Sequence, residues 1–221
     1  DLSKLITHAF PFQEAPKAYD LILNKAEAFS GIVLEYDTKK KILDRVNLKD
    51  KPTATDSISV GMIGAGSFGQ NFLLPALQGK ATLTGIATAR ANNARNVADK
   101  FGFTYCTGNA NEIIHDPAIN TIFIATRHDS HGEYVLKALK EGKNVFTEKP
   151  LCIHPDELEA IREQYPQSSA HLMVGFNRRF APLAIEMKKQ LNANLPSAIN
   201  YRINAGIVPK EHWTHDPASG G

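Results

Sequence analysis

The sequence lacks the features that direct a chain to a membrane, a nucleic acid or a metal. Its 221 residues include only two cysteines, Cys106 and Cys152, which lie far apart and form no ligand-like cluster. No apolar run approaches the roughly 20 residues of a membrane-spanning helix, and no signal peptide is recognisable. Lys and Arg number 25 against 23 Asp and Glu, so the net charge is only +2. We therefore expect a reduced, cytoplasmic protein with no metal and no nucleic-acid or membrane partner.

The chain also lacks an initial methionine, since it begins at Asp1 and ends on Gly220 and Gly221. We expect both ends to be cut from a longer protein. Composition and turn signals divide the chain into four parts. Residues 1–37 have a strand–helix–strand pattern, and residues 38–56 form a polar linker in which residues 42–48 can pack locally. Residues 57–180 form the main domain, and residues 181–221 begin a second domain with a strand at 197–206.

The main domain alternates short apolar runs with amphipathic stretches. The expected strands are 58–63, 82–87, 121–125, 144–146 and 172–176, and the expected helices include 92–102, 131–143 and 154–165. Buried strands that alternate with helices predict a parallel sheet covered on both faces. The fold class is therefore α/β, a Rossmann-like doubly wound sheet.

A glycine loop follows the first strand of this domain. Gly64, Gly66 and Gly69 fit G-x-G-x-x-G at a strand-to-helix turn, with Ser67 and Phe68 inside the loop. Such glycines permit a tight turn, close approach of a pyrophosphate and close packing of helix on strand. A ligand-free glycine turn is the alternative. The surrounding strands and helices favour dinucleotide binding, while Pro75 is expected to kink the helix that follows.

The acid that normally holds the ribose of NAD is missing. No Asp or Glu occurs between Ser57 and Ala98, and the second strand runs instead into Thr88 and Arg90. A carboxylate here would repel a 2′-phosphate, whereas Arg90 can pair with it and Thr88 can donate a hydrogen bond. The sequence therefore favours NADP over NAD, unless Arg90 is only a solvated loop residue.

Glu148 and Lys149 follow the strand at 144–146, where ligands of doubly wound sheets bind. Three segments, "GMIGAGSFGQ", "TIFIATRHDSHGEYVLKALKEGKNVFTEKPL" and "MVGFNRRFAP", together resemble the glucose-fructose oxidoreductase / inositol dehydrogenase (Gfo/Idh/MocA) family. The resemblance covers residues 57–221 and implies an NAD(P)-dependent oxidoreductase of sugars or polyols. It implies a Rossmann domain followed by an α/β sheet domain through which the full-length protein forms a homo-oligomer.

The resemblance assigns roles to single residues. Lys149 matches the catalytic lysine of the family's Glu-Lys-Pro motif, beside the nicotinamide and substrate. Thr126 and His131 match a cofactor loop, and Arg179 matches a position near the cleft. The loop departs from the family's usual Thr-Pro-Asn, since Arg127 follows Thr126 and offers a further phosphate or ribose contact. The family's catalytic Asp and His would lie beyond Gly221, so we expect this chain to bind cofactor but not to turn over sugar efficiently.

Residues 1–37 carry a second resemblance. "LITHAFPFQEAPKAYDLI" followed by "GIVLEY" is similar to the last strand, helix and strand of a medium-chain zinc-type alcohol dehydrogenase. This implies a fusion oxidoreductase, such as those of surface-polysaccharide metabolism. In the alternative interpretation, the main domain is a non-catalytic dinucleotide-binding module accessory to the alcohol dehydrogenase half.

Overall fold

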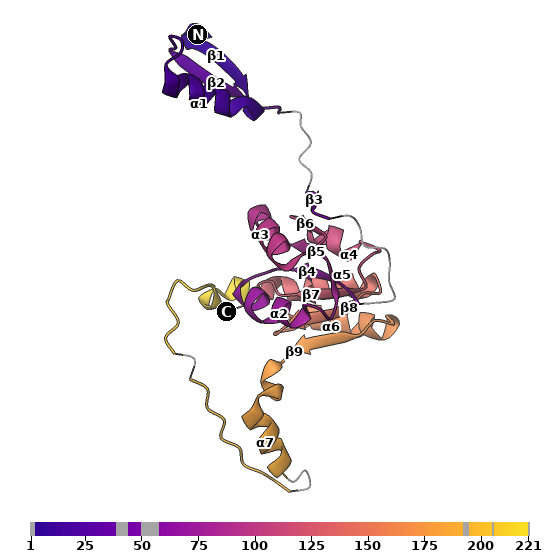
Figure 1. Ribbon diagram of the computed structural model, residues 1–221. Helices are drawn as coiled ribbons and strands as arrows, with labels where there is room; N and C mark the ends of the chain where they lie inside the picture. The colour runs from indigo at the N-terminus through magenta and orange to yellow at the C-terminus, as the bar shows by residue number, and fades with distance from the viewer. Residues whose placement is uncertain (1–2, 39–43, 50–57, 192–194, 205, 221) are drawn as a thin grey trace. The chain divides into compact units, whose positions relative to one another are not determined.

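The computed structural model describes residues 3–38, 44–49, 58–191, 195–204 and 206–220 (Figure 1). The chain divides into two compact units, Asp1–Leu43 and Asp44–Gly221. Within the described ranges, no helix has the length and apolarity needed to cross a membrane. The same residues bring no three His, Cys, Asp or Glu side chains together as a metal site.

The first unit is a small parallel βαβ arrangement. Strand β1 (Ile6–Pro11) and strand β2 (Gly31–Glu35) pair in parallel and are joined by helix α1 (Ala15–Asn24). The predicted strand–helix–strand order is confirmed. Helix α1 ends at Asn24, because Lys25 adopts a left-handed conformation (φ 49°).

The second unit is built on a seven-stranded sheet of order β3-β6-β5-β4-β7-β8-β9. The strands are β3 (Arg45–Asn47), β4 (Ser59–Ile63), β5 (Thr82–Ala87), β6 (Tyr105–Thr107), β7 (Thr121–Ile124), β8 (Asn144–Glu148) and β9 (Leu172–Gly175). All neighbouring strands pair in parallel except β3, which runs antiparallel to β6. The five predicted strands are confirmed to within two residues at each end, while β3 and β6 were not predicted as strands.

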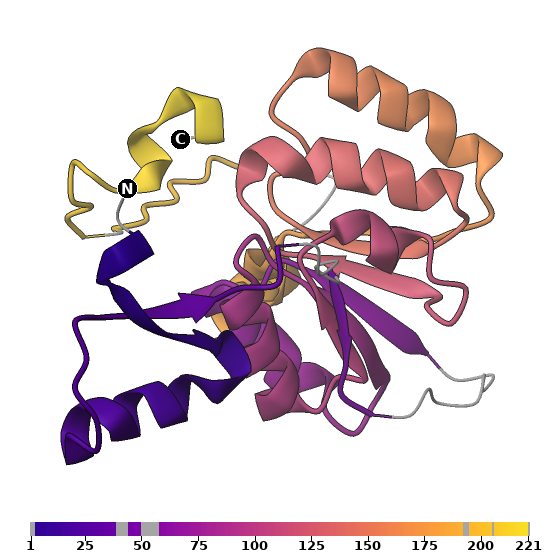
Figure 2. The same ribbon diagram turned by 90° about the horizontal axis from the view of Figure 1, so that it is seen from above.

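Helices cover both faces of this sheet, as Figure 2 shows from above. They are α2 (Leu74–Leu77), α3 (Ala91–Phe101), α4 (Ala110–Ile114), α5 (His131–Lys140), α6 (Pro155–Gln164) and, beyond the sheet, α7 (Pro182–Gln190). One apolar core joins α4, α5 and α6 to the sheet, and a second core on the other face joins α2 and α3. A doubly wound sheet has one apolar core on each of its two faces, so the predicted fold class is confirmed.

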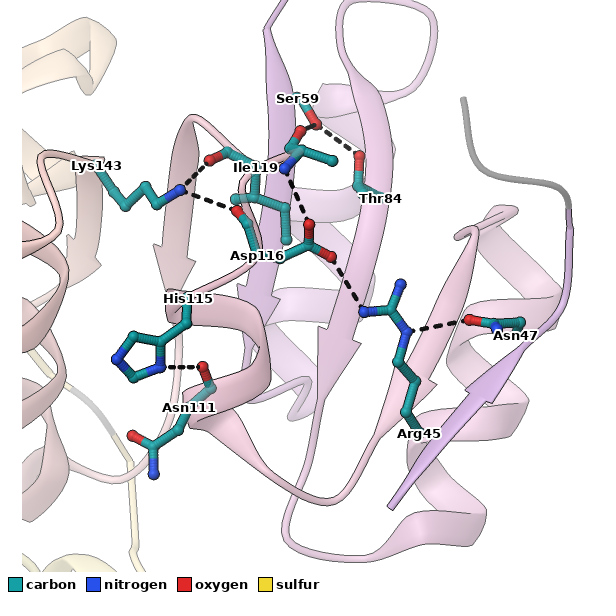
Figure 3. Close-up of polar contacts among 10 residues, drawn as sticks. Arg45, Asn47, Ser59, Thr84, Asn111, His115, Asp116, Ile119 and Lys143 are labelled. Carbon is teal, nitrogen blue, oxygen red and sulfur yellow. Dashed lines mark hydrogen bonds and ion pairs between the residues drawn. The ribbon is translucent and has the colours of Figure 1, made fainter. Parts of the chain in front are cut away.

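Part of the predicted linker belongs to the sheet. Strand β3 places Arg45 against Asp116, with 3.2 Å between Nη1 and Oδ2 (Figure 3). The Arg45 guanidinium also stacks 3.5 Å from the centre of the Tyr105 ring. The Asp116 carboxylate also accepts the Ala118 N–H at 2.9 Å. Lys143 Nζ donates to two backbone carbonyls of the same loop, those of Asp116 (2.9 Å) and Ile119 (2.6 Å). The expectation that residues 42–48 pack locally is met by residues 44–48, while 39–43 and 50–57 lie outside the described residues.

The described residues after Ala181 pack less tightly, since most of them are exposed. The strand predicted at 197–206 does not form in its described residues, 197–204 and 206. An extended segment becomes a strand only where a neighbour accepts its backbone hydrogen bonds, and no described strand pairs with it. Further on, two short turns at Trp213–His215 and Pro217–Ser219 end the described chain.

Candidate functional site

The glycine loop joins β4 to the helix after it. Gly64 has φ +83°, and an added Cβ would lie 2.6 Å from the carbonyl oxygen of Ala125, so only glycine fits this turn. At Gly69 a Cβ would lie 2.7 Å from Cε of Met62, which sets the close packing of helix on strand. At Gly66 a Cβ would meet no atom of the described residues within 4 Å, its two chain neighbours aside. Protein packing thus explains Gly64 and Gly69 but not Gly66, whose bare backbone leaves room for a ligand to approach.

The helix after this loop is irregular, as Pro75 predicts. It begins at Ser67 and Phe68, passes through a π-helical turn over Gly69–Leu73 and ends as the single turn α2. Ser67 is exposed, Phe68 is half-buried, and the rings of Phe68 and Phe72 lie 5.2 Å apart. The loop therefore leads into a short, bent helix.

Thr88 and Arg90 follow the end of strand β5, beside this loop. Thr88 is buried, and its hydroxyl donates to the carbonyl of Arg90 at 2.7 Å. That proton is therefore already used inside the turn, and Thr88 could donate to a phosphate only if this bond broke. Arg90 is exposed at the start of α3, and no hydrogen bond or ion pair of its side chain is found among the described residues.

The loop after β7 contains Thr126, Arg127 and His131. The Ser130 hydroxyl donates to Oγ1 of Thr126 at 2.7 Å, whereas Arg127 is exposed. His131 is fully buried at the start of α5, with Nδ1 2.7 Å from the carbonyl of Pro150 and Nε2 3.3 Å from the carbonyl of Thr126. Its ring thus lies between two loops and has no exposed face in this structure.

Strand β8 carries Glu148 and Lys149 to the same edge. Glu148 is half-buried, and burial raises the pKa of its carboxyl group despite the opposing effects of Lys149 and His131. Lys149 is exposed and precedes Pro150 through a cis peptide bond. Gly175 on β9 leaves room for the Glu148 side chain, because a Cβ at Gly175 would lie 2.8 Å from Oε1 of Glu148.

Arg179 follows β9 in a short turn, Asn177–Phe180. Its Nε donates to the carbonyl of Phe176 at 3.2 Å, and its side chain is exposed. The predicted site residues therefore all follow carboxyl ends of the parallel strands β4, β5, β7, β8 and β9, which meet at one edge of the sheet.

The structure adds neighbours that the sequence did not indicate. The C-terminal turn contacts the loop after β7, since His128 Nδ1 lies 2.7 Å from the carbonyl of Gly220 and the His128 ring packs edge-on against Trp213 at 4.8 Å. A polar hollow of about 370 Å³ also opens at this edge. It is lined by residues that follow β6 and by the first turns of α5, among them Asn109, Glu133 and Tyr134.

A glycine loop with an unexplained open position, at the carboxyl edge of a doubly wound sheet, is the arrangement that binds dinucleotides. The profile of one family, described as an oxidoreductase family with an NAD-binding Rossmann fold (GFO_IDH_MocA), matches residues 58–176, just over half of the chain. The chain belongs to the Gfo/Idh/MocA oxidoreductase family. The family resemblance expected from the sequence is thereby confirmed.

Relatives within the Gfo/Idh/MocA family act on polyols and sugars. The chain is 30% identical over 145 residues to scyllo-inositol 2-dehydrogenase (NAD(+)) of Bacillus subtilis, which is 64% of this chain and 42% of that protein. It is 30% identical over 175 residues to levoglucosan dehydrogenase of Pseudarthrobacter phenanthrenivorans, which is 74% of this chain and 43% of that protein. The chain thus spans about two fifths of the length of these relatives.

Solved structures agree in fold. A levoglucosan dehydrogenase in complex with NADH and levoglucosan matches with a TM-score of 0.54 and 30% identity, over 60% of this chain and 38% of that one. A 3-ketoreductase from Actinomadura kijaniata in complex with NADP matches with a TM-score of 0.56 and 24% identity, over 61% and 44%. The second likeness shows the fold alone.

Proposed function

We propose that this chain is the cofactor-binding part of an oxidoreductase that transfers hydride between NADP(H) and a sugar or polyol derivative. The observation that carries the proposal is Gly66, which protein packing leaves open at the sheet edge where Lys149 also stands. When bound, the nicotinamide dinucleotide supplies the hydride acceptor or donor. The glycine loop and the helix start after it would hold the pyrophosphate through backbone N–H groups.

Lys149 is the residue that we propose for the chemistry. Its exposed side chain has no hydrogen-bond or ion-pair partner among the described residues, which leaves Nζ available for the reacting oxygen of the substrate. A hydrogen bond donated by Nζ would orient the reacting oxygen and stabilise the negative charge that develops on it as hydride leaves the adjacent carbon for the cofactor. Glu148 and Arg179 would border the same cleft.

Arg90 supports NADP over NAD. It is exposed beside the glycine loop, and residues 57–98 contain no carboxylate to repel a 2′-phosphate. Thr88 would act by shaping this turn through its bond to Arg90, and Thr126 and Arg127 would border the cofactor from the loop after β7.

The first unit fits a separate origin. Its parallel βαβ arrangement supports the proposal that it is the tail of a medium-chain alcohol dehydrogenase-like half in a fusion protein. In that case the full-length protein would contain zinc, which elemental analysis would detect.

Calorimetric titration with NADPH and NADH tests the cofactor proposal. We expect NADPH to bind at least about tenfold more tightly, a preference that Arg90→Asp abolishes by replacing attraction with repulsion. Equal binding of both nucleotides by the unaltered chain would overturn the NADP assignment, and binding of neither would overturn the function.

Lys149→Met in the full-length protein tests the chemistry. We expect NADPH to bind as before, while oxidation of scyllo-inositol, myo-inositol or levoglucosan with NADP⁺ falls by about a hundredfold or more for whichever of them is turned over. Unchanged turnover would remove Lys149 from the reaction.

A further inference from the structure

His131 occupies an unusual position for a polar side chain. It is the first residue of α5, it is fully buried, and both of its ring nitrogens face backbone carbonyls. The two carbonyls belong to different loops, one at Thr126 directly after β7 and one at Pro150 directly after Lys149. A single rigid ring therefore spans the cofactor loop and the loop that carries the proposed catalytic lysine.

Helix capping does not explain this histidine. The positive end of the helix dipole lies at the N-terminus of α5, where a basic side chain gains nothing from the dipole. The contact from Nδ1 to the carbonyl of Pro150 is the shorter of the two, 2.7 Å against 3.3 Å from Nε2 to the carbonyl of Thr126, and this marks Nδ1 as the stronger donor. An apolar side chain would remove the ring donor of the Pro150 carbonyl and the polar contact to the Thr126 carbonyl.

We propose that His131 is a positioning residue that sets the spacing between the loop after β7 and the loop bearing Lys149. The ring does not touch cofactor or substrate. It keeps the distance between Thr126 and Lys149 constant, so that the cofactor and the reacting oxygen of the substrate are held at a fixed separation. This inference rests on the proposed function for its catalytic meaning, although the coupling of the two loops can be measured without it.

Two conservative variants of the full chain separate the two contacts. In His131→Asn the side-chain amide can take the place of Nδ1 and keep the bond to Pro150, whereas in His131→Gln the longer amide can take the place of Nε2 and keep the contact to Thr126. His131→Phe keeps an aromatic ring and loses both. His115→Asn is the matched control, because His115 is an exposed histidine at the end of α4.

Amide hydrogen exchange by mass spectrometry gives a local readout. We expect His131→Asn to speed exchange about fivefold or more in residues 126–130 and to leave residues 148–153 unchanged, with the reverse in His131→Gln. His131→Phe speeds both segments. We expect NADPH affinity to depend on the order of residues 126–130, so it should weaken more in His131→Asn than in His131→Gln.

Uniform acceleration over the whole second unit in both variants would show a merely structural histidine and overturn the proposal. Exchange at the rate of the unaltered chain in both segments would also overturn it. If the unaltered chain fails to bind NADPH, the proposed function fails, but the exchange pattern still decides whether His131 couples the loops.

Discussion

Asp116 shows how a single residue depends on a distant one. Its side chain is only 5% exposed, and burial by itself raises the pKa of its carboxyl group. Hydrogen bonds from the Ala118 N–H and from Arg45 favour the charged form and outweigh burial, so the net pKa is lowered from its ordinary value of 3.8. A carboxylate with a lowered pKa stabilises the fold above its unfolded pKa, and this contribution is lost as the pH falls through the folded pKa.

Arg45→Ala should therefore destabilise the second unit at pH 7. We expect a loss of about 1–3 kcal/mol, below the figure for a fully buried pair because the Arg45 side chain is 26% exposed. The loss should shrink as the pH falls through the lowered folded pKa of Asp116, because the protonated carboxyl no longer pairs with Arg45. Urea unfolding at pH 7 and pH 3 measures both effects. Arg95→Ala, which breaks an exposed pair with Asp99, is the control and should change little. An equal loss at both pH values would exclude the carboxylate as the cause.

Among the elements, long periodic segments were predictable and short ones were not. The five long strands and the helices α3, α5 and α6 follow from apolar spacing within the segments themselves. Strands β3 and β6 have three residues each, too few to show a period. They exist because β3 pairs with β6 and β6 pairs with β5. The strand predicted at 197–206 failed for the converse reason, since its pattern has no described neighbour to pair with. Long-range pairing is the information that a local pattern lacks.

The glycine loop offers a contrast between two similar substitutions. Gly66→Ala should leave stability unchanged, because its Cβ meets no protein atom, but should weaken NADPH binding about tenfold or more by blocking close approach of the phosphates. Gly64→Ala should cost about 1–3 kcal/mol of stability, because Gly64 has φ +83° and its Cβ would lie 2.6 Å from the backbone carbonyl oxygen of Ala125. Thermal unfolding and NADPH titration of both variants separate the two effects. If Gly66→Ala binds NADPH normally, the open position has no ligand role.

At the scale of the whole second unit, the parallel sheet gathers residues that are far apart in the sequence. The sequence could predict this gathering, since parallel strands place their carboxyl ends at one edge and each predicted site residue follows such an end. It could not predict which side chains are already engaged. The bond from Thr88 to Arg90, the burial of His131 and the contact of Trp213 with His128 depend on packing between distant loops.

The antiparallel strand β3 also determines at which residue a truncated protein should begin if it is not to aggregate. A parallel sheet that ended at β6 would present an unpaired strand edge, which invites other chains to pair with it and aggregate. The three residues Arg45–Asn47 cover that edge, although they lie within the segment that composition alone assigns to a linker. A protein that starts at residue 58 should therefore scatter light and sediment as aggregates at concentrations where one that starts at residue 44 stays monodisperse. If both stay monodisperse, β3 does not protect the edge. If only the protein that starts at residue 58 aggregates, the boundary of this domain lies before Arg45, inside the apparent linker.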